Sequence, residues 1–197
     1  MIKQIKELKL NELKRIYKAH VREDFPRSER RPYSSMEKMT NTGKYVSFGY
    51  YDDGRLLAYA CYILTEDRMY ALLDYFAVIP ELRGHGIGSE FLQKLEGILQ
   101  ANKGAFIEVE SPDSAKSKEE AALRRRRIHF YLSNGAVLTN TKCLLFGVDY
   151  NILYIGRIDG TDSEPEQLHC AIEELYREIY RPVYGLLCKL YVPEDSR

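Results

Sequence analysis

The stretch PELRGHGIGSEFLQKL, residues 80–95, places Gly84, Gly86 and Gly88 at alternate positions immediately before a predicted helix. Glycine in an ordered element costs about 0.5–1 kcal/mol relative to alanine, so this much backbone freedom needs a reason. A strand, a glycine-rich turn and a helix N-terminus together form an anion site, because the first N–H groups of a helix lack partners and the helix dipole adds partial positive charge. Arg83 adds a permanent positive charge beside the loop.

Three kinds of phosphate-binding motif can be compared with this glycine spacing. A P-loop requires GxxxxGK[ST], and no Lys-Ser or Lys-Thr pair follows these glycines at that spacing. A Rossmann fingerprint requires GxGxxG in a first βαβ unit, whereas the spacing here is GxGxG and the loop lies in the middle of the chain. The remaining interpretation is an R-x-x-G-x-G loop, formed by Arg83, Gly86 and Gly88, after a strand that ends in FAV.

Hydrophobic periodicity and turn residues predict the elements on either side of this loop. The tyrosine-rich stretch before the loop is broken by DDGR and TEDR, which are turn sequences, and predicts three antiparallel strands. The predicted elements are helices over 10–23 and around Met36 and Met39, strands over 45–51, 55–64 and 68–78, a helix after the glycine loop, a strand over 104–111, a helix ending near Asn134 and Gly135, two strands within 142–158 and a helix over 162–181. This order indicates a single α+β domain over 1–197.

Composition and charge narrow the class of protein. Lys+Arg and Asp+Glu both number 29, so the net charge of zero predicts neither a nucleic-acid nor a membrane partner. The N-terminal stretch is charged and lacks a signal-peptide region, no stretch is apolar enough to span a membrane, and the four cysteines form no CxxC pair. We therefore expect a cytoplasmic protein with buried free thiols. His20, His129 and His169 have no ligand spacing, so we expect no metal site.

Two motifs in order resemble one family. LLDYFAVIPELRGHGIGSEFLQKL (72–95) looks like the acyl-CoA signature of the GCN5-related N-acetyltransferase (GNAT) superfamily. IEVE resembles the strand that follows in that family, and RRIHFYLSNGA (126–136) resembles its F-Y-x-x-x-G-F motif, with Ala136 in place of the last aromatic residue. The resemblance covers about residues 1–158 and leaves a helical tail over about 160–197. It implies an α/β/α sandwich, in which helices flank a mixed, mostly antiparallel sheet.

The resemblance also implies a co-substrate, acetyl-CoA, and a set of site residues. The strand before the loop is expected to pair its backbone with the pantetheine arm, and the loop amides are expected to hold the pyrophosphate. Tyr131 corresponds to the tyrosine that protonates the leaving thiolate. The backbone positions are Phe76, Ala77 and Val78 for pantetheine, and Arg83, Gly84, His85, Gly86, Ile87, Gly88 and Ser89 for the pyrophosphate.

Acyl transfer from a thioester to an amine also needs a base, because an ammonium group has no lone pair with which to attack. Glu108 is the first candidate, since it occupies the position of the glutamate in the similar LEVR strand of ribosomal-protein N-terminal acetyltransferases. Glu110 shares a strand face with Glu108, and Asp74 is the third candidate. For each of them, a solvated or salt-bridged carboxylate is the alternative interpretation.

The chain departs from the family pattern in one region. Arg124 and Arg127 stand where close relatives carry an asparagine and a small residue, and an insertion, SPDSAKSKEEAA (111–122), precedes them. The arginine run could bind nucleic acid or the 3′-phosphate of the cofactor. We favour a solvated helix face on which Glu119 and Glu120 act as partners.

These observations predict an N-acetyltransferase in which the amine attacks acetyl-CoA directly in a ternary complex. The alternative is a non-catalytic acyl-CoA-binding module; a Rossmann oxidoreductase has little support. The acceptor is expected to be a small-molecule or peptide amine. The sequence leaves open which amine it is, because the acceptor pocket is built from variable loops such as 24–32 and no motif codes for it. The protein is expected to be a monomer or a homodimer. The tail tyrosines are expected to pack on the chain's own sheet, with the partner subunit of a homodimer as the alternative.

Overall fold

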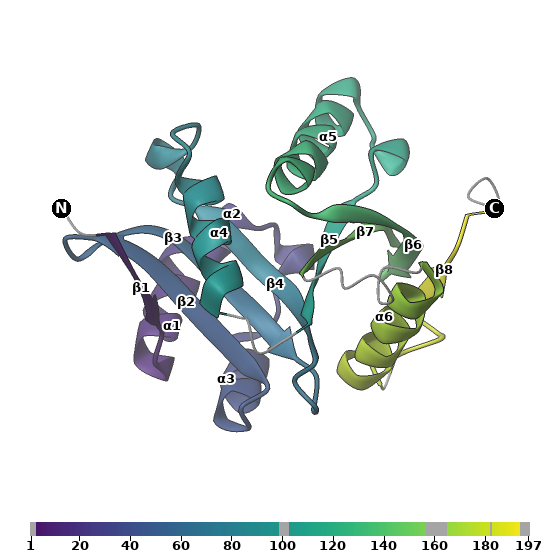
Figure 1. Ribbon diagram of the computed structural model, residues 1–197, viewed down its shortest axis with the longest axis horizontal. Helices are drawn as coiled ribbons and strands as arrows, with labels where there is room; N and C mark the ends of the chain where they lie inside the picture. The colour runs from purple at the N-terminus through teal and green to yellow at the C-terminus, as the bar shows by residue number, and fades with distance from the viewer. Residues whose placement is uncertain (1–2, 99–102, 157–164, 182, 194–197) are drawn as a thin grey trace. The chain divides into compact units, whose positions relative to one another are not determined.

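Two compact units make up the chain in the computed structural model, which describes residues 3–98, 103–156, 165–181 and 183–193. The first unit contains Met1–Glu66 and Leu73–Ile98, and the second contains Asp67–Leu72 and Leu99–Arg197. The described part of the chain has eight strands and flanking helices, which confirms the expected α+β class (Figure 1). No helix among the described residues has the length and apolar character that a membrane span requires.

The strands of the first unit follow one another in the order β1-β2-β3-β4. They are β1 (Lys3–Glu7), β2 (Tyr45–Asp52), β3 (Arg55–Leu64) and β4 (Tyr70–Val78), of which β4 begins in the second unit. β2 pairs antiparallel with both β1 and β3, and Asp53 and Gly54 turn the chain with positive φ angles of 46° and 79°. Two such residues match the twist of the flanking strands, so the DDGR hairpin is confirmed.

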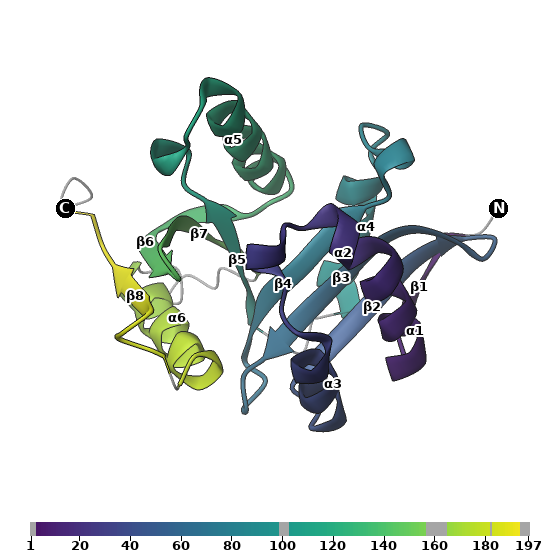
Figure 2. The same ribbon diagram turned by 180° about the vertical axis from the view of Figure 1, so that it is seen from behind.

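Helices cover both faces of this unit (Figure 1; Figure 2). A continuous helical run comprises α1 (Leu10–Ile16), a π-helical turn (Tyr17–Val21) and α2 (Arg22–Asp24), and it lies with α3 (Tyr33–Asn41) on one face. The other face carries α4 (Ile87–Ile98). Phe91 of α4 stacks on Tyr50 of β2 at 5.2 Å and on Phe76 of β4 at 5.6 Å. Burial of these rings fixes the helix, and with it the loop before it, against the sheet.

The second unit is built on antiparallel strands in the order β5-β7-β6-β8. Its elements are β5 (Gly104–Glu110), a 3-10 turn (Pro112–Ser114), α5 (Lys118–Ser133), β6 (Val137–Leu145), β7 (Val148–Gly156), α6 (Pro165–Ile179) and β8 (Cys188–Tyr191). β6 bulges between Leu138 and Lys142, where the Thr139 hydroxyl donates to the Ile152 carbonyl at 2.8 Å. The Tyr191 hydroxyl donates to Asp149 at 2.5 Å, so the tail packs on its own sheet as expected.

Several boundaries differ from the sequence prediction. β1 and β8 were not predicted: β1 is a charged edge strand with no fully buried residue, and β8 has only four residues, so neither carries a clear alternating pattern. β6 begins at Val137 rather than at 142. Cys170 is exposed, unlike the other three cysteines, because it lies on the outer side of α6. The predicted element ends at 157–158 and 162–164 lie outside the described residues.

Candidate active site

The glycine loop connects β4 to α4 through a 3-10 turn, Pro80–Leu82. Gly84 and Gly86 have φ angles of +81° and +76°, a conformation that L side chains rarely adopt, and a Cβ added at either position would meet nothing within 4 Å. Gly88 is different, since it is buried in the first turn of α4. The helix begins with the Glu90 N–H donating to the Gly86 carbonyl at 3.0 Å. The N–H groups of the first turn therefore face an open approach, which suits a bound phosphate.

Arg83 is part of an ion pair within the first unit. Its Nη2 donates to Asp24 Oδ1 at 2.7 Å, its Nε donates to the Val78 carbonyl at 3.0 Å, and the Tyr59 hydroxyl donates to Asp24 Oδ2 at 2.9 Å. The Asp24 side chain is only 6% exposed, whereas that of Arg83 is 54% exposed. The loop is thus tied to the end of α2. The positive charge expected beside the phosphates is balanced by this carboxylate.

Asp74 of β4 holds the segment that follows α2. The Arg31 guanidinium donates to both carboxylate oxygens at 3.1–3.3 Å, and the Tyr45 hydroxyl donates to Oδ2 at 2.7 Å. The next residue, Tyr75, accepts the Arg31 backbone N–H at 2.6 Å and packs edge-on against Phe25 at 4.8 Å. Burial raises the pKa of Tyr45 well above its ordinary value, so this hydroxyl stays protonated and remains a donor. These contacts anchor the Asp74 carboxylate to Arg31 and Tyr45.

Glu108 lies half-buried on β5, opposite Ile152 of β7. The hydroxyl of Tyr176, a fully buried residue of α6, donates a hydrogen bond to Glu108 Oε1. Burial first, and then the nearby Glu108 carboxylate, raise the pKa of Tyr176 well above 10.0, so the phenol stays protonated. Tyr176 stands 68 positions from Glu108 in the sequence, where the only signal was a helical run of tyrosines in the tail.

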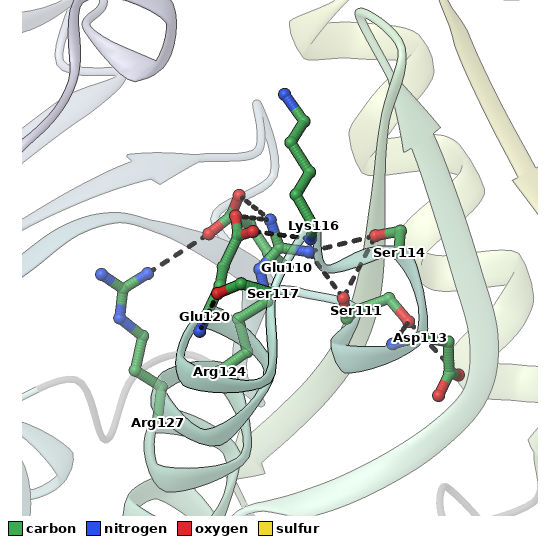
Figure 3. A network of polar contacts seen from close by, with 9 residues as sticks. All are labelled: Glu110, Ser111, Asp113, Ser114, Lys116, Ser117, Glu120, Arg124 and Arg127. Atoms are coloured by element: carbon green, nitrogen blue, oxygen red, sulfur yellow. Dashed lines mark hydrogen bonds and ion pairs between the residues drawn. The ribbon is translucent and has the colours of Figure 1, made fainter.

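Glu110 takes part in a polar cluster around Arg124 (Figure 3). Arg124 is 5% exposed, and its Nη2 donates to Glu110 at 2.9 Å and to Glu120 at 2.7 Å. Its Nη1 donates to the Ser111 carbonyl at 2.7 Å and to Ser114 Oγ at 3.1 Å. The Arg124 guanidinium therefore fastens the insertion, 111–122, to the end of β5. These contacts also engage the Glu110 carboxylate.

The four arginines at 124–127 differ in their exposure to solvent. Arg125 and Arg126 are exposed, which fits the predicted solvated face, and the expected partnership with Glu120 is confirmed. The prediction was wrong for Arg124, which is buried because the insertion folds over it. Arg127 remains half-exposed and reaches Glu110 Oε2 at 3.4 Å. Arg124 thus acts as an internal clamp between the insertion and the end of β5.

We expect replacement of Arg124 by methionine (R124M) to lower the free energy of unfolding by about 3 kcal/mol, because removing one partner of a buried ion pair leaves the other without compensation. Chemical denaturation measures this change. The control is R125M, one residue along on the exposed side, for which a change within about 0.5 kcal/mol is expected. Equal losses in the two variants would contradict the clamp.

Tyr131 follows Arg124 by seven residues on α5, close to two helical turns, so both side chains leave the same side of the helix. It is half-buried, its ring lies 5.1 Å from that of Phe130, and burial raises its pKa. The helix ends at the predicted place: Asn134 is the C-cap, and Gly135 follows with a φ angle of +92°. A phenol with a raised pKa is protonated at neutral pH, as a proton donor must be.

The candidate residues divide between the two units. Phe76, Ala77, Val78 and the glycine loop belong to the first unit, as does Asp74; Glu108, Glu110 and Tyr131 belong to the second. Within the second unit the structure pairs Glu108 with Tyr176 and Glu110 with Arg124. In the ranges that the structure describes, no group of three His, Cys, Asp or Glu side chains is placed to hold a metal ion.

Comparisons with known proteins identify acetyltransferases as similar to this chain. The family model described as the acetyltransferase (GNAT) family matches residues 10–135. A comparison with curated protein sequences gives no match.

Solved structures of acetyltransferases share the fold. A putative acetyltransferase of the GNAT family from Bacteroides thetaiotaomicron is 20% identical, with 90% of this chain and 98% of that chain covered and a TM-score of 0.69. The ribosomal-protein-S18-alanine N-acetyltransferase from Escherichia coli is 20% identical over 79% of this chain and 94% of that chain, with a TM-score of 0.57. A spermidine N-acetyltransferase from Vibrio cholerae, solved with CoA and spermine, is 14% identical over 78% and 95%, also with a TM-score of 0.57.

Proposed function

The chain belongs to the GNAT family of acetyltransferases, enzymes that take an acetyl group from acetyl-CoA. From this premise we propose that it transfers the acetyl group to a primary amine, which attacks acetyl-CoA directly in a ternary complex. The observation that carries the proposal is the glycine loop before α4. Gly84 and Gly86 hold left-handed conformations in open space, so a pyrophosphate can approach the amides at the helix start. The residues present therefore fit the diphosphate of CoA.

The backbone from Arg83 to Ser89 would hold the pyrophosphate, and the backbone of Phe76, Ala77 and Val78 would hold the pantetheine arm. N–H groups of that strand would also polarise the thioester carbonyl, on which negative charge develops during acyl transfer. Here acetyl-CoA supplies the activated acetyl group and the thiolate leaving group. The two proton transfers are assigned to side chains of this chain.

Two side chains carry the proton transfers in this proposal. Glu108 accepts the proton of the attacking amine, and Tyr131 donates a proton to the departing thiolate. Glu108 is preferred as base on the family resemblance, and each of the two alternatives is paired with arginine: Asp74 binds Arg31 and Tyr45, and Glu110 binds Arg124 and Arg127. Tyr131 suits the acid because burial raises its pKa.

The acceptor class is a small-molecule or peptide amine. Two structural neighbours carry such substrates in their names, one acting on the alanine of ribosomal protein S18 and one on spermidine. The segment 24–32, expected to face the acceptor, engages three of its charged side chains internally: Asp24 binds Arg83, Arg31 binds Asp74, and Arg30 Nε donates to the Phe25 carbonyl. We also propose that the protein is cytoplasmic, forms a single functional domain and has no nucleic-acid partner. In this proposal it is a monomer or a homodimer.

Calorimetric titration with acetyl-CoA, with NAD as the control ligand, tests the cofactor site. We expect saturable one-site binding of acetyl-CoA and no binding of NAD. Release of the CoA thiol is then followed with spermidine, an alanine-initiated peptide and a lysine-containing acetyl-capped peptide as acceptors. Binding with no turnover on any amine would favour the non-catalytic acyl-CoA-binding alternative, and absence of acetyl-CoA binding would contradict the whole proposal.

A further inference from the structure

The helix α6 supplies a polar group to the strand that carries the proposed base. The family model matches residues 10–135, and α6 (Pro165–Ile179) lies beyond that stretch. α6 nevertheless places one fully buried tyrosine, Tyr176, with its hydroxyl on Glu108 Oε1. A buried hydroxyl aimed at a carboxylate from a separate element is a specific arrangement, since burial of an unpaired hydroxyl would be costly.

Buried side chains of β6 and α6 adjoin Tyr176. Cys143 of β6 is buried beside Tyr176, Cys188 of β8 is buried beside Cys143, and Tyr180 of α6 lies with its ring 5.3 Å from that of Tyr176. A hydrogen bond with Cys188, together with burial, raises the pKa of Cys143, so this thiol is neutral. The guanidinium groups of α5 bind Glu110, two positions further along β5. The Tyr176 hydroxyl donates to Glu108, and a hydrogen bond of this kind favours the ionised form of a carboxyl group.

We propose that Tyr176 is a positioning residue for Glu108, one that orients the carboxylate and keeps it ionised and ready to accept a proton. The inference rests on the proposed function, in which Glu108 is the base. Partial burial favours the neutral form of a carboxyl group, and a hydrogen bond donated to the carboxylate favours the charged form. Tyr176 opposes the effect of burial. The hydrogen bond also holds Oε1 of Glu108 in place, so the carboxylate keeps one orientation and its second oxygen can accept the proton.

The test is the variant Y176F, compared with Y191F. Both changes remove one hydroxyl that donates to a carboxylate of the second unit, but Tyr191 bonds to Asp149 and not to Glu108. The first readout needs no acceptor: carbon NMR of protein labelled at the glutamate side-chain carboxyl follows each group through a pH titration, and E108Q identifies the Glu108 signal. We expect the midpoint of the Glu108 titration to rise by about one pH unit in Y176F, as loss of a hydrogen bond to a charged group implies. In Y191F it should stay in place.

The second readout is kinetic and uses whichever amine of the panel is turned over. A base must be deprotonated to act, so a higher midpoint moves the acidic limb of the kcat/KM profile to higher pH. On that limb the rate of Y176F should fall about tenfold for each unit of displacement. The KM for acetyl-CoA should not change, because the phosphates bind elsewhere in the proposal. A role in packing alone would change thermal stability and leave both profiles in place.

The outcomes separate this inference from the proposed function. No midpoint change in Y176F, or an equal change in Y191F, overturns the role of Tyr176 even if the enzyme is active. If E108Q retains the wild-type rate, Glu108 is not the base and the inference falls with that assignment, while acetyl-CoA binding and turnover stand.

Should Y176F not fold, a ring-fluorinated tyrosine at position 176 keeps the shape and has a more acidic hydroxyl. We then expect the Glu108 midpoint to fall, and a rise or no change would overturn the proposal.

Discussion

Replacing Gly86 with aspartate (G86D) should raise the Kd for acetyl-CoA at least about a hundredfold. Gly86 immediately precedes α4, so its side chain would stand where the pyrophosphate is proposed to meet the helix amides. Two unit charges about 4 Å apart repel by about 4 kcal/mol near a protein surface, which corresponds to about a thousandfold in affinity before solvent screening. The carboxylate would also compete for the same N–H groups.

This loss should not come from unfolding. Aspartate before a helix contributes about 1 kcal/mol as a cap, and its cost in a left-handed conformation is of similar size, so the two effects nearly offset each other. A Cβ at this position meets no atom within 4 Å. Thermal denaturation should therefore give nearly the wild-type midpoint, while calorimetry shows the loss of acetyl-CoA binding.

Two variants control for strain and for charge. G86N demands the same left-handed backbone with an uncharged side chain of almost the same size, and we expect an affinity within about tenfold of the wild type, because asparagine tolerates this conformation. G54D introduces the same residue at a second open glycine with positive φ, in the β2–β3 turn, and should leave the affinity unchanged. Wild-type affinity in G86D would show that the glycine loop is not the phosphate site.

The parts of the fold that could be predicted from sequence are those with local causes. The DDGR turn requires residues that accept positive φ, and it delimits β2 and β3 to within one residue. The glycine loop and the Gly135 stop likewise depend on backbone conformations that few residues allow. At these places one residue type carries the information, so periodicity and turn chemistry were sufficient.

What could not be predicted depends on contacts between distant segments. Nothing in a run of four arginines distinguishes Arg124 from Arg125; the distinction arises when the insertion folds its Ser111 carbonyl and Glu120 onto one guanidinium. The partnership of Glu108 with Tyr176 joins residues 68 positions apart, and the tyrosine is one of 16 in the chain. The order of the candidate bases was set by resemblance. It stays a prediction, since Glu108, Glu110 and Asp74 all have hydrogen-bond partners in the structure.

The variant Y131F should lower kcat about a hundredfold and leave the Kd for acetyl-CoA within about twofold, since general-acid catalysis typically contributes a factor of at least that size. The change removes one oxygen from a half-buried ring and leaves the Phe130 contact in place. Steady-state kinetics with an accepted amine and calorimetry with acetyl-CoA give the two numbers. The matched control is Y184F, which removes a hydroxyl bonded to Glu173 in the same unit and should keep the wild-type rate.

The pH dependence of the wild type gives a second, independent check on Tyr131. An acid must be protonated to act, so its ionisation produces a basic limb at which the rate falls. Burial raises the pKa of Tyr131 above its ordinary value of 10.0, which moves any such limb above pH 10. Below that, the wild-type kcat should show only the acidic limb of the base. A basic limb near neutral pH that disappears in Y131F would contradict the raised pKa; an undiminished kcat in Y131F would mean that the thiolate leaves without a proton from this residue, and the acid would have to be sought elsewhere on the chain.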